Sequence, residues 1–263
     1  MPDISERRYL GAFKCIDRVT GFPLTRALRI QAAQVDFFRN RSNLYVIKNA
    51  QGLETYTRAF NPVPDLPANE SLPYTVQIED PLNHYLPRQV QIKLPRDADP
   101  ANRDNPSSLF NPVSVSLYAS PNAALLANWS TIRVAVTRQI DGDDIPVAAA
   151  LIRVVRLEDD TVLSSGLSDQ RGEALVIVAG IPITQFASQE ELDELDELDE
   201  LDAEPAPVIV SATPVRIEVS SIPDTAWPAN PDELELNHAA NLVASENLSL
   251  RTGRMEQLTI QLT

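Results

Sequence analysis

Hydrophobic and polar residues alternate along much of the chain, which is the pattern of a half-buried β-strand. The segment 113–118 shows it most cleanly, because Val113, Val115 and Leu117 are separated by serines. Similar segments follow at a spacing of about ten residues, as in sandwiches and barrels, and are bounded by Asn, Pro, Gly or Asp. The pattern predicts strands at 12–16, 24–32, 44–47, 56–60, 74–78, 90–94, 113–118, 131–137, 151–157, 161–164, 174–178, 208–210, 215–219, 248–250 and 258–262.

No long helix is indicated between these strands, although 122–129 is predicted to form one or two helical turns. Consecutive short strands favour antiparallel sheets, because parallel strands need long crossover connections. We therefore predict an all-β fold. It consists of two tandem antiparallel β-sandwich domains, transthyretin-like or immunoglobulin-like, at residues 1–120 and 121–263.

The two halves of the chain repeat several features. Residues 20–30 resemble 144–154, since each has a proline-containing turn before an alternating strand, and residues 41–47 resemble 171–177. Two explanations of this repetition stay open: a domain duplication, and chance similarity, because short strands often have similar sequences.

The segment 190–204 contains ten acidic residues and no basic one, with Leu-Asp-Glu repeated three times. Leucines three residues apart rotate by about 60° per step around a helix, so they form no continuous apolar seam. Unpaired negative charges repel one another and favour an extended, solvated chain. We therefore predict an acidic low-complexity loop insertion at 188–206. A docking strip for a basic partner and a weak site for divalent cations are the alternatives.

Composition narrows the possible partners. The net charge is −15, and −5 remains once the acidic segment is set aside, so the chain lacks the basic surface that nucleic acid requires. The 21 prolines and 8 glycines fit short strands joined by turns and exclude collagen and glycine-rich nucleotide-binding loops. No apolar stretch is long enough for a membrane span or a secretion signal, so we expect a cytoplasmic protein.

Candidate catalytic chemistry is sparse. His84 and His238 are the only histidines, so a metal site built from clustered imidazoles is excluded, and neither accompanies a nucleophile-elbow motif. Cys15 is the single cysteine, which excludes an internal disulfide, and its place in an alternating strand predicts a buried structural thiol. Residues 141–144 resemble the start of a calcium loop but lack its later ligands, so we interpret them as a hairpin turn. No cofactor or metal is expected, and the chain is predicted not to be an enzyme.

One short segment concentrates an acid, an imidazole, a phenol and a guanidinium, in Asp80, His84, Tyr85 and Arg88. Such a set fits an acid–base cluster. It fits better a proline-bracketed turn in which Asp80 accepts backbone hydrogen bonds and Tyr85 covers the sheet edge. Because turns lie at the surface, these four residues are the predicted contact with a partner.

A first strand, a Pro-x-Ala segment at 146–150 and a Ser-Asp-Gln-Arg-Gly-Glu turn at 168–173 occur in one stretch. Together these features make residues 131–180 resemble the carboxypeptidase-regulatory-like, or transthyretin-like, β-sandwich. The family usually has Thr at the start of the turn and an aromatic-rich strand after it, whereas this chain has Ser and an aliphatic strand. In the turn, Asp169 is expected to accept backbone hydrogen bonds and Gly172 to adopt a positive φ.

A second likeness rests on short motifs between residues 8 and 183. They lie at 20–24, 43–47, 52–57, 80–81, 85–88, 94–97, 108–112 and 128–129. Together they resemble a family of uncharacterised proteins associated with gene clusters for phage-tail-like contractile injection systems. The family offers no catalytic signature.

This resemblance implies a non-enzymatic structural or adaptor subunit of a contractile injection system, associated with the baseplate. Its partners would be other subunits of a large particle assembled in the cytoplasm. The alternative is a stand-alone β-sandwich module that binds a carbohydrate or a protein ligand, although the chain has only 6% aromatic residues with which to line a groove. An enzyme of unfamiliar type would need His84 or Asp80 for a hydrolytic reaction.

Overall fold

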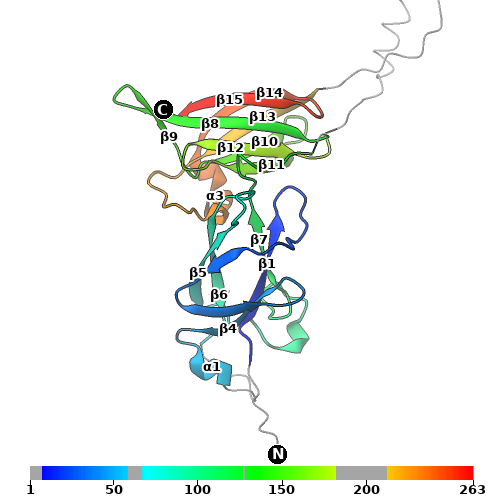
Figure 1. Ribbon diagram of the computed structural model, residues 1–263, viewed down its shortest axis with the longest axis vertical. Helices are drawn as coiled ribbons and strands as arrows, with labels where there is room; N and C mark the ends of the chain where they lie inside the picture. Colours follow the sequence, from blue (N-terminus) through cyan, green and yellow to red (C-terminus); the bar gives the residue numbers. More distant parts are fainter. Residues whose placement is uncertain (1–7, 59–66, 127, 182–211, 263) are drawn as a thin grey trace, which may run out of the picture.

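The computed structural model describes residues 8–58, 67–126, 128–181 and 212–262. Regular structure within these ranges consists mostly of β-strands, so the predicted all-β class is confirmed. Two β-sandwiches follow each other along the chain and lie end to end in space (Figure 1). The acidic insertion predicted at 188–206 and the strand predicted at 208–210 lie outside the described residues.

The first sandwich has two sheets, with strand orders β3-β4-β1-β7 and β2-β5-β6. Side chains from both sheets meet between them: Phe13, Ile47, Val76 and Ile92 are each at most 2% exposed. They alternate with more exposed neighbours, which is why a period of two indicates these strands. The elements are β1 (Gly11–Asp17), β2 (Arg29–Gln31), β3 (Val35–Arg39), β4 (Tyr45–Ala50), α1 (Glu54–Arg58), β5 (Leu72–Glu79), β6 (Arg88–Leu94), η1 (Pro100–Asn102) and β7 (Val113–Leu117).

The second sandwich has strand orders β11-β10-β13-β14 and β12-β8-β15, and β9 pairs with the end of β8. Its core contains Ile132, Val154, Val176 and Ile217, all fully buried. The elements are β8 (Ser130–Ile140), β9 (Asp143–Pro146), β10 (Leu151–Arg156), β11 (Val162–Leu167), β12 (Glu173–Val178), β13 (Thr213–Ser220), α3 (Pro231–Leu236), η2 (His238–Asn241), β14 (Leu242–Leu250) and β15 (Met255–Leu262).

The strand predicted at 56–60 is wrong for the part that is described, because Glu54–Arg58 forms α1. Leu53, Tyr56 and Thr57 are the buried side chains here. A spacing of three and four places them on one face of a helix, and a search for alternation misses that face.

Further segments also differ from the prediction, among them β9 and the first part of β14, which were not predicted as strands. The strand predicted at 24–32 is limited to β2, and β3 was not predicted because Val-Asp-Phe-Phe-Arg does not alternate. The helical turns predicted at 122–129 are absent from the described residues of that segment. The segment instead packs Leu125 and Trp129 against Leu175 and Ile177 of β12.

Two strand pairs are parallel, which corrects the prediction of purely antiparallel sheets. β1 pairs with β7 and β8 pairs with β15, whereas the other pairs between the described strands are antiparallel. In each sandwich the chain passes through the opposite sheet before its last strand returns beside its first. This long route makes a parallel pairing possible.

The two sandwiches repeat one topology. The first strand of each, β1 or β8, lies between an antiparallel strand, β4 or β12, and a parallel one, β7 or β15. The opposite sheets match as well, since β2-β5-β6 corresponds to β10-β13-β14. They differ in one strand, because β3 pairs with β4 whereas its counterpart β11 pairs with β10 in the other sheet. The repeated sequence features therefore lie on corresponding strands and turns of the two sandwiches.

Candidate partner-binding surface

The turn between β5 and β6 begins at Asp80, whose side chain is buried. Its carboxylate accepts hydrogen bonds from the backbone N–H groups of Leu82 at 3.1 Å and His84 at 3.0 Å. The guanidinium of Arg26 forms an ion pair with the same carboxylate at 3.1 Å. Asn83 adopts φ 54°, a left-handed conformation that Asn tolerates well. The prediction that Asp80 accepts backbone hydrogen bonds is confirmed.

Tyr85 connects this turn to β1. Its hydroxyl donates a hydrogen bond to Asp17 at 2.6 Å, and the Arg26 guanidinium lies 5.4 Å from the centre of its ring. Burial raises the pKa of Tyr85, and the hydrogen bond to Asp17 raises it further. The backbone of Tyr85 forms a bridge with Ala119, so the turn lies against the chain that continues from β7.

Arg88 begins β6 and is 1% exposed. Its Nη1 donates to the Ser116 carbonyl at 2.6 Å, its Nε donates to the Gln89 carbonyl at 3.2 Å, and its Nη2 forms an ion pair with Asp232 of α3 at 2.5 Å. Asp232 belongs to the second sandwich, so one buried guanidinium connects β6, β7 and α3. A buried charge needs such a complete set of partners, because desolvation without them is costly.

The four residues of the predicted partner contact differ in exposure. Asp80 and Arg88 are buried, and their polar atoms are bound to groups of the same chain, so their side chains shape the turn and join the sandwiches. His84 and Tyr85 are half-buried. A contact between this turn and a partner stays a prediction.

α3 brings a second acid to the junction between the sandwiches. Oε1 of Glu235 accepts hydrogen bonds from Arg18 at 2.9 Å, from the Ser165 hydroxyl at 2.9 Å and from the Tyr118 hydroxyl at 3.2 Å. Arg18 and Tyr118 belong to the first sandwich, whereas Ser165 lies on β11 of the second. Burial raises the pKa of Tyr118, and the negative charge of Glu235 raises it further.

Apolar packing underlies these polar contacts. Leu86 and Tyr118 from the first sandwich form one buried cluster with Leu151, Leu167 and Leu234 from the second. Figure 1 shows α3 between the two sandwiches, where its residues reach both. The sandwiches are therefore joined through buried side chains as well as through the connecting chain, which restrains their relative motion.

α3 and its partners were not predicted from the sequence. The start of the helix was detectable, because Asn230, Pro231 and two acidic residues form a typical helix N-terminus. The contacts themselves were not detectable. Arg88 and Asp232 are 144 residues apart in the sequence, and Arg18 and Glu235 are 217 apart.

Two hollows flank the turn. One, of about 260 Å³, opens between the sandwiches and is lined by Tyr85 and Trp227 together with Asp169 and Arg171. The other, of about 240 Å³, adjoins Asp80 and is also lined by Tyr85. Both hollows are lined by aromatic or proline rings together with charged and amide groups.

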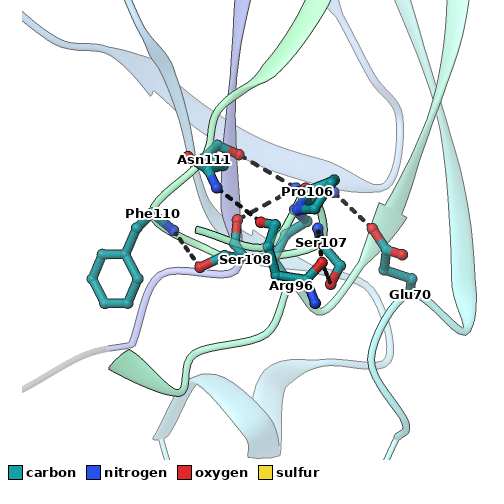
Figure 2. A network of polar contacts seen from close by, with 8 residues as sticks. Glu70, Arg96, Pro106, Ser107, Ser108, Phe110 and Asn111 are labelled. Carbon is teal, nitrogen blue, oxygen red and sulfur yellow. Dashed lines mark hydrogen bonds and ion pairs between the residues drawn. The ribbon is translucent and has the colours of Figure 1, made fainter. Parts of the chain in front are cut away.

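A second polar centre lies in the connection between β6 and β7, around the buried Arg96 (Figure 2). Its guanidinium forms an ion pair with Glu70 at 2.7 Å and donates to the carbonyls of Pro106, Ser108 and Asn111. The motifs at 94–97 and 108–112, which are far apart along the loop, therefore meet at one side chain. These motifs hold the loop in shape.

A buried serine–histidine–carboxylate contact occurs in the second sandwich. Ser220 Oγ lies 2.5 Å from Nδ1 of His238, and Nε2 of His238 lies 2.7 Å from Glu218. In hydrolase triads the serine pairs with Nε2, so the two ring nitrogens have opposite roles here. Ser220 is fully buried, and a substrate cannot reach its hydroxyl. The contact therefore serves to hold η2 against β13.

The turn at Asp169 agrees with the sequence analysis. The carboxylate accepts hydrogen bonds from the N–H groups of Arg171 at 2.8 Å and Glu173 at 3.1 Å, and Gly172 adopts φ 72°. A Cβ at Gly172 would lie 2.4 Å from the Val136 carbonyl oxygen, so the position requires glycine.

Residues 141–144 form the turn and first residues of the β8–β9 hairpin. Asp141 and Gly142 adopt φ 53° and 94°, as the commonest two-residue hairpin turn requires. The interpretation of this segment as a hairpin turn is confirmed.

Within the described ranges, no group of three or more His, Cys, Asp or Glu side chains is placed to hold a metal ion. No helix in the same ranges is both long and hydrophobic enough to span a bilayer.

Comparisons with known proteins give little further information. No protein-family model matches the chain, and no curated protein is similar to it at a significant level. Solved structures similar to it include the minor pilin GBS52 of Streptococcus agalactiae, with 8% identity and a TM-score of 0.29 over 85% of this chain and 65% of that one. The Bacillus anthracis TIE protein has 8% identity and a TM-score of 0.25 over 97% of this chain and 34% of that one.

A mutant of the shaft pilin spaA from Lactobacillus rhamnosus GG has 9% identity and a TM-score of 0.25 over 98% of both chains. The chain thus spans less than two thirds of the length of the first two of these proteins. At such low scores, the likeness carries no conclusion about function.

Proposed function

We propose that the chain is a non-enzymatic structural or adaptor subunit of a large protein assembly. The observation that carries this proposal is the junction, where Arg88, Asp232 and Glu235 join the two sandwiches through buried contacts. A joined pair of sandwiches presents surfaces at a fixed distance and angle. Assemblies of repeated subunits depend on such fixed surfaces for closure.

The motifs that resemble proteins of contractile injection systems point to the kind of assembly, and we place the chain at or near the baseplate. Several of these motifs have roles in the fold. Residues 85–88 form the junction turn, and 94–97 meets 108–112 at Arg96. A resemblance that rests on such residues supports a shared scaffold and is consistent with the proposed structural function.

The proposal is tested by purification of the tagged full-length chain from its native cells, followed by mass spectrometry and negative-stain imaging. Co-purification with sheath and tube proteins, in particles that carry the tag at one end, is the expected result. Recovery of the chain without tail-like partners, under conditions in which a tagged sheath protein yields whole particles, would contradict the proposal.

The hollow of about 260 Å³ between the sandwiches, which we call the groove, favours a second candidate function, a stand-alone module that binds a carbohydrate or protein ligand. Tyr85 and Trp227 line this groove beside Asp169 and Arg171. An aromatic surface with flanking charges suits a sugar or a peptide. Screening of the purified chain against a glycan array and a peptide library tests this candidate. Binding that is lost in Trp227→Ala and retained in Trp129→Ala would support it, and an absence of hits would exclude it.

A further inference from the structure

The two sandwiches close corresponding sheet edges differently. In the first, β6 and β7 are edge strands of the two sheets and lie next to each other. The gap between them is bridged, because Arg88 donates to the Ser116 carbonyl, the Leu86 N–H donates to Tyr118 and the Ser120 N–H donates to His84.

The corresponding strands of the second sandwich, β14 and β15, have no such bridge. β14 pairs with β13 and β15 pairs with β8, and in the described part of the chain neither strand has a backbone hydrogen bond to a further strand. Residues 221–241, which join β13 to β14, contain α3 and run to the junction instead of covering this edge. Figure 1 shows β15 on the side of the second sandwich that faces away from the first.

β15 also lacks the features that protect an edge strand. Its eight residues contain no proline, lysine or arginine, and Glu256 is its single charge. Proteins usually place such residues on exposed edges to prevent pairing with another chain. Next to this edge, Leu248 of β14 and Leu258 of β15 pack against the core but remain partly exposed. An added strand would cover them.

The sequence of β15 indicates which strand would fit. Residues 257–261 read Gln-Leu-Thr-Ile-Gln, which has the same polarity in both directions around Thr259. If two such strands pair antiparallel about Thr259, Gln257 lies opposite Gln261 and Leu258 opposite Ile260. Thr259 then lies opposite itself. Like pairs with like, no charges repel, and the apolar pair falls on the core side.

We propose that a second copy of this chain pairs with the β15 edge, antiparallel and about a twofold axis at Thr259. The contact is isologous, so it closes on itself and forms a dimer. The inference goes beyond the proposed function, because self-association of the purified chain neither requires nor excludes other subunits.

The first experiment measures the mass of the purified full-length chain by light scattering and sedimentation over a range of concentrations. The expected species has twice the 29.0 kDa mass of one chain. Thr259→Lys places two positive charges opposite each other at the axis, and we expect it to weaken the dimer at least about tenfold. The control is Ser249→Lys on the neighbouring β14 edge, which should leave the dimer unchanged. Circular dichroism confirms that both variants fold.

A second measurement is independent of how Thr259→Lys affects folding. Thr259→Cys should form a symmetric disulfide under mild oxidation, because directly opposed residues in an antiparallel pair have Cα atoms about 4.5–5.5 Å apart, a separation that a disulfide spans. Cys15 is buried, so it does not compete, and Ser249→Cys is the matched control that should stay uncrosslinked. A monomer at every concentration would overturn the proposal, as would a dimer that survives Thr259→Lys or a crosslink that forms only through residue 249.

Discussion

The two sandwiches share their strand order except for one edge strand, but they place their long connections differently. In the first, the long connection 95–112 joins β6 to β7 and is organised by Arg96. In the second, β14 and β15 are joined by a short turn, and the long connection 221–241 carries α3 and η2 into the junction. Strand alternation determines a common scaffold, whereas the connections decide which sheet edges are closed and where the sandwiches touch.

One kind of turn recurs in both sandwiches. At Asn40, Asp80 and Asp169 the side chain accepts hydrogen bonds from the backbone N–H groups two and four residues further on. The residue three positions later has a positive φ in each case, and it is Asn43, Asn83 or Gly172. These Asx-type turns use a local side chain to satisfy backbone groups where a strand ends.

The largest effect is expected at the closed edge of the first sandwich. Arg88→Ala leaves a cavity and removes the donor from the carbonyls of Gln89 and Ser116, whereas Asp232 is largely exposed and stays hydrated, so we expect a loss of about 2–4 kcal/mol of unfolding free energy. The control, Arg29→Ala, removes an exposed ion pair with Glu79 and costs less than about 1 kcal/mol. Urea titrations followed by fluorescence measure both values. Equal losses in the two variants would show that Arg88 contributes no more to stability than an exposed ion pair does.

An exchange of turn residues between the sandwiches tests how far their equivalence extends. Gly172→Asn introduces a Cβ 2.4 Å from the Val136 carbonyl and is expected to cost about 2–4 kcal/mol. Asn43→Gly accepts the same left-handed backbone, loses one contact with Arg39 and costs about 1 kcal/mol or less. Melting temperatures of the two variants give the comparison. If Gly172→Asn were the milder change, the Val136 carbonyl would not restrict the side chain at position 172.

These turns also show what the sequence could reveal. The roles of Asp80, Asp169 and Gly172 follow from local chemistry, since their partners lie within four residues. Strands such as β5 and β7 follow from alternation, because one face of each packs on a core. Sequence pairs residues 41–47 with 171–177, but the hydrogen bonds align Asn40 with Asp169, so the sequence comparison is out of register by one residue.

The candidate surface was less predictable. Asp80, His84, Tyr85 and Arg88 were identified as one group, but burial of the first and last depends on residues far away in the sequence. Nothing local distinguishes an arginine that faces solvent from one that meets Asp232. The parallel pairing of β15 with β8 was unpredictable for the same reason, since pairing between distant strands leaves no mark in the pattern of either strand.

A smaller effect is expected when acid acts on the second sandwich. Burial raises the pKa of the Glu218 carboxyl, but hydrogen bonds and charges from Arg216 and His238 outweigh burial, so its pKa is lowered from 4.5. A lowered pKa in the folded state gives stability above the unfolded value, which is lost as the pH falls through the folded one.

Glu218→Gln should therefore be less stable than the wild-type chain at neutral pH and lose less stability below about pH 4.5. Unfolding titrations at a series of pH values measure this. Glu79→Gln, at the exposed ion pair of the first sandwich, is the control. Parallel acid limbs for Glu218→Gln and the wild-type chain would exclude a contribution of this carboxyl.

The smallest expected signal is the labelling of Cys15, whose reactivity measures the opening of the first sandwich without any substitution in that sandwich's core. Burial raises the pKa of its thiol to about 12, so at pH 8 only about one molecule in ten thousand carries the reactive thiolate. Labelling with a thiol reagent should therefore be negligible in the native protein and should rise with denaturant. If the junction joins the sandwiches into one cooperative unit, labelling follows the global unfolding curve in the wild-type chain. In Arg88→Ala it should precede loss of the second sandwich, as measured by hydrogen exchange in β13. Labelling that precedes global unfolding already in the wild-type chain would mean that the first sandwich opens on its own, in spite of α3.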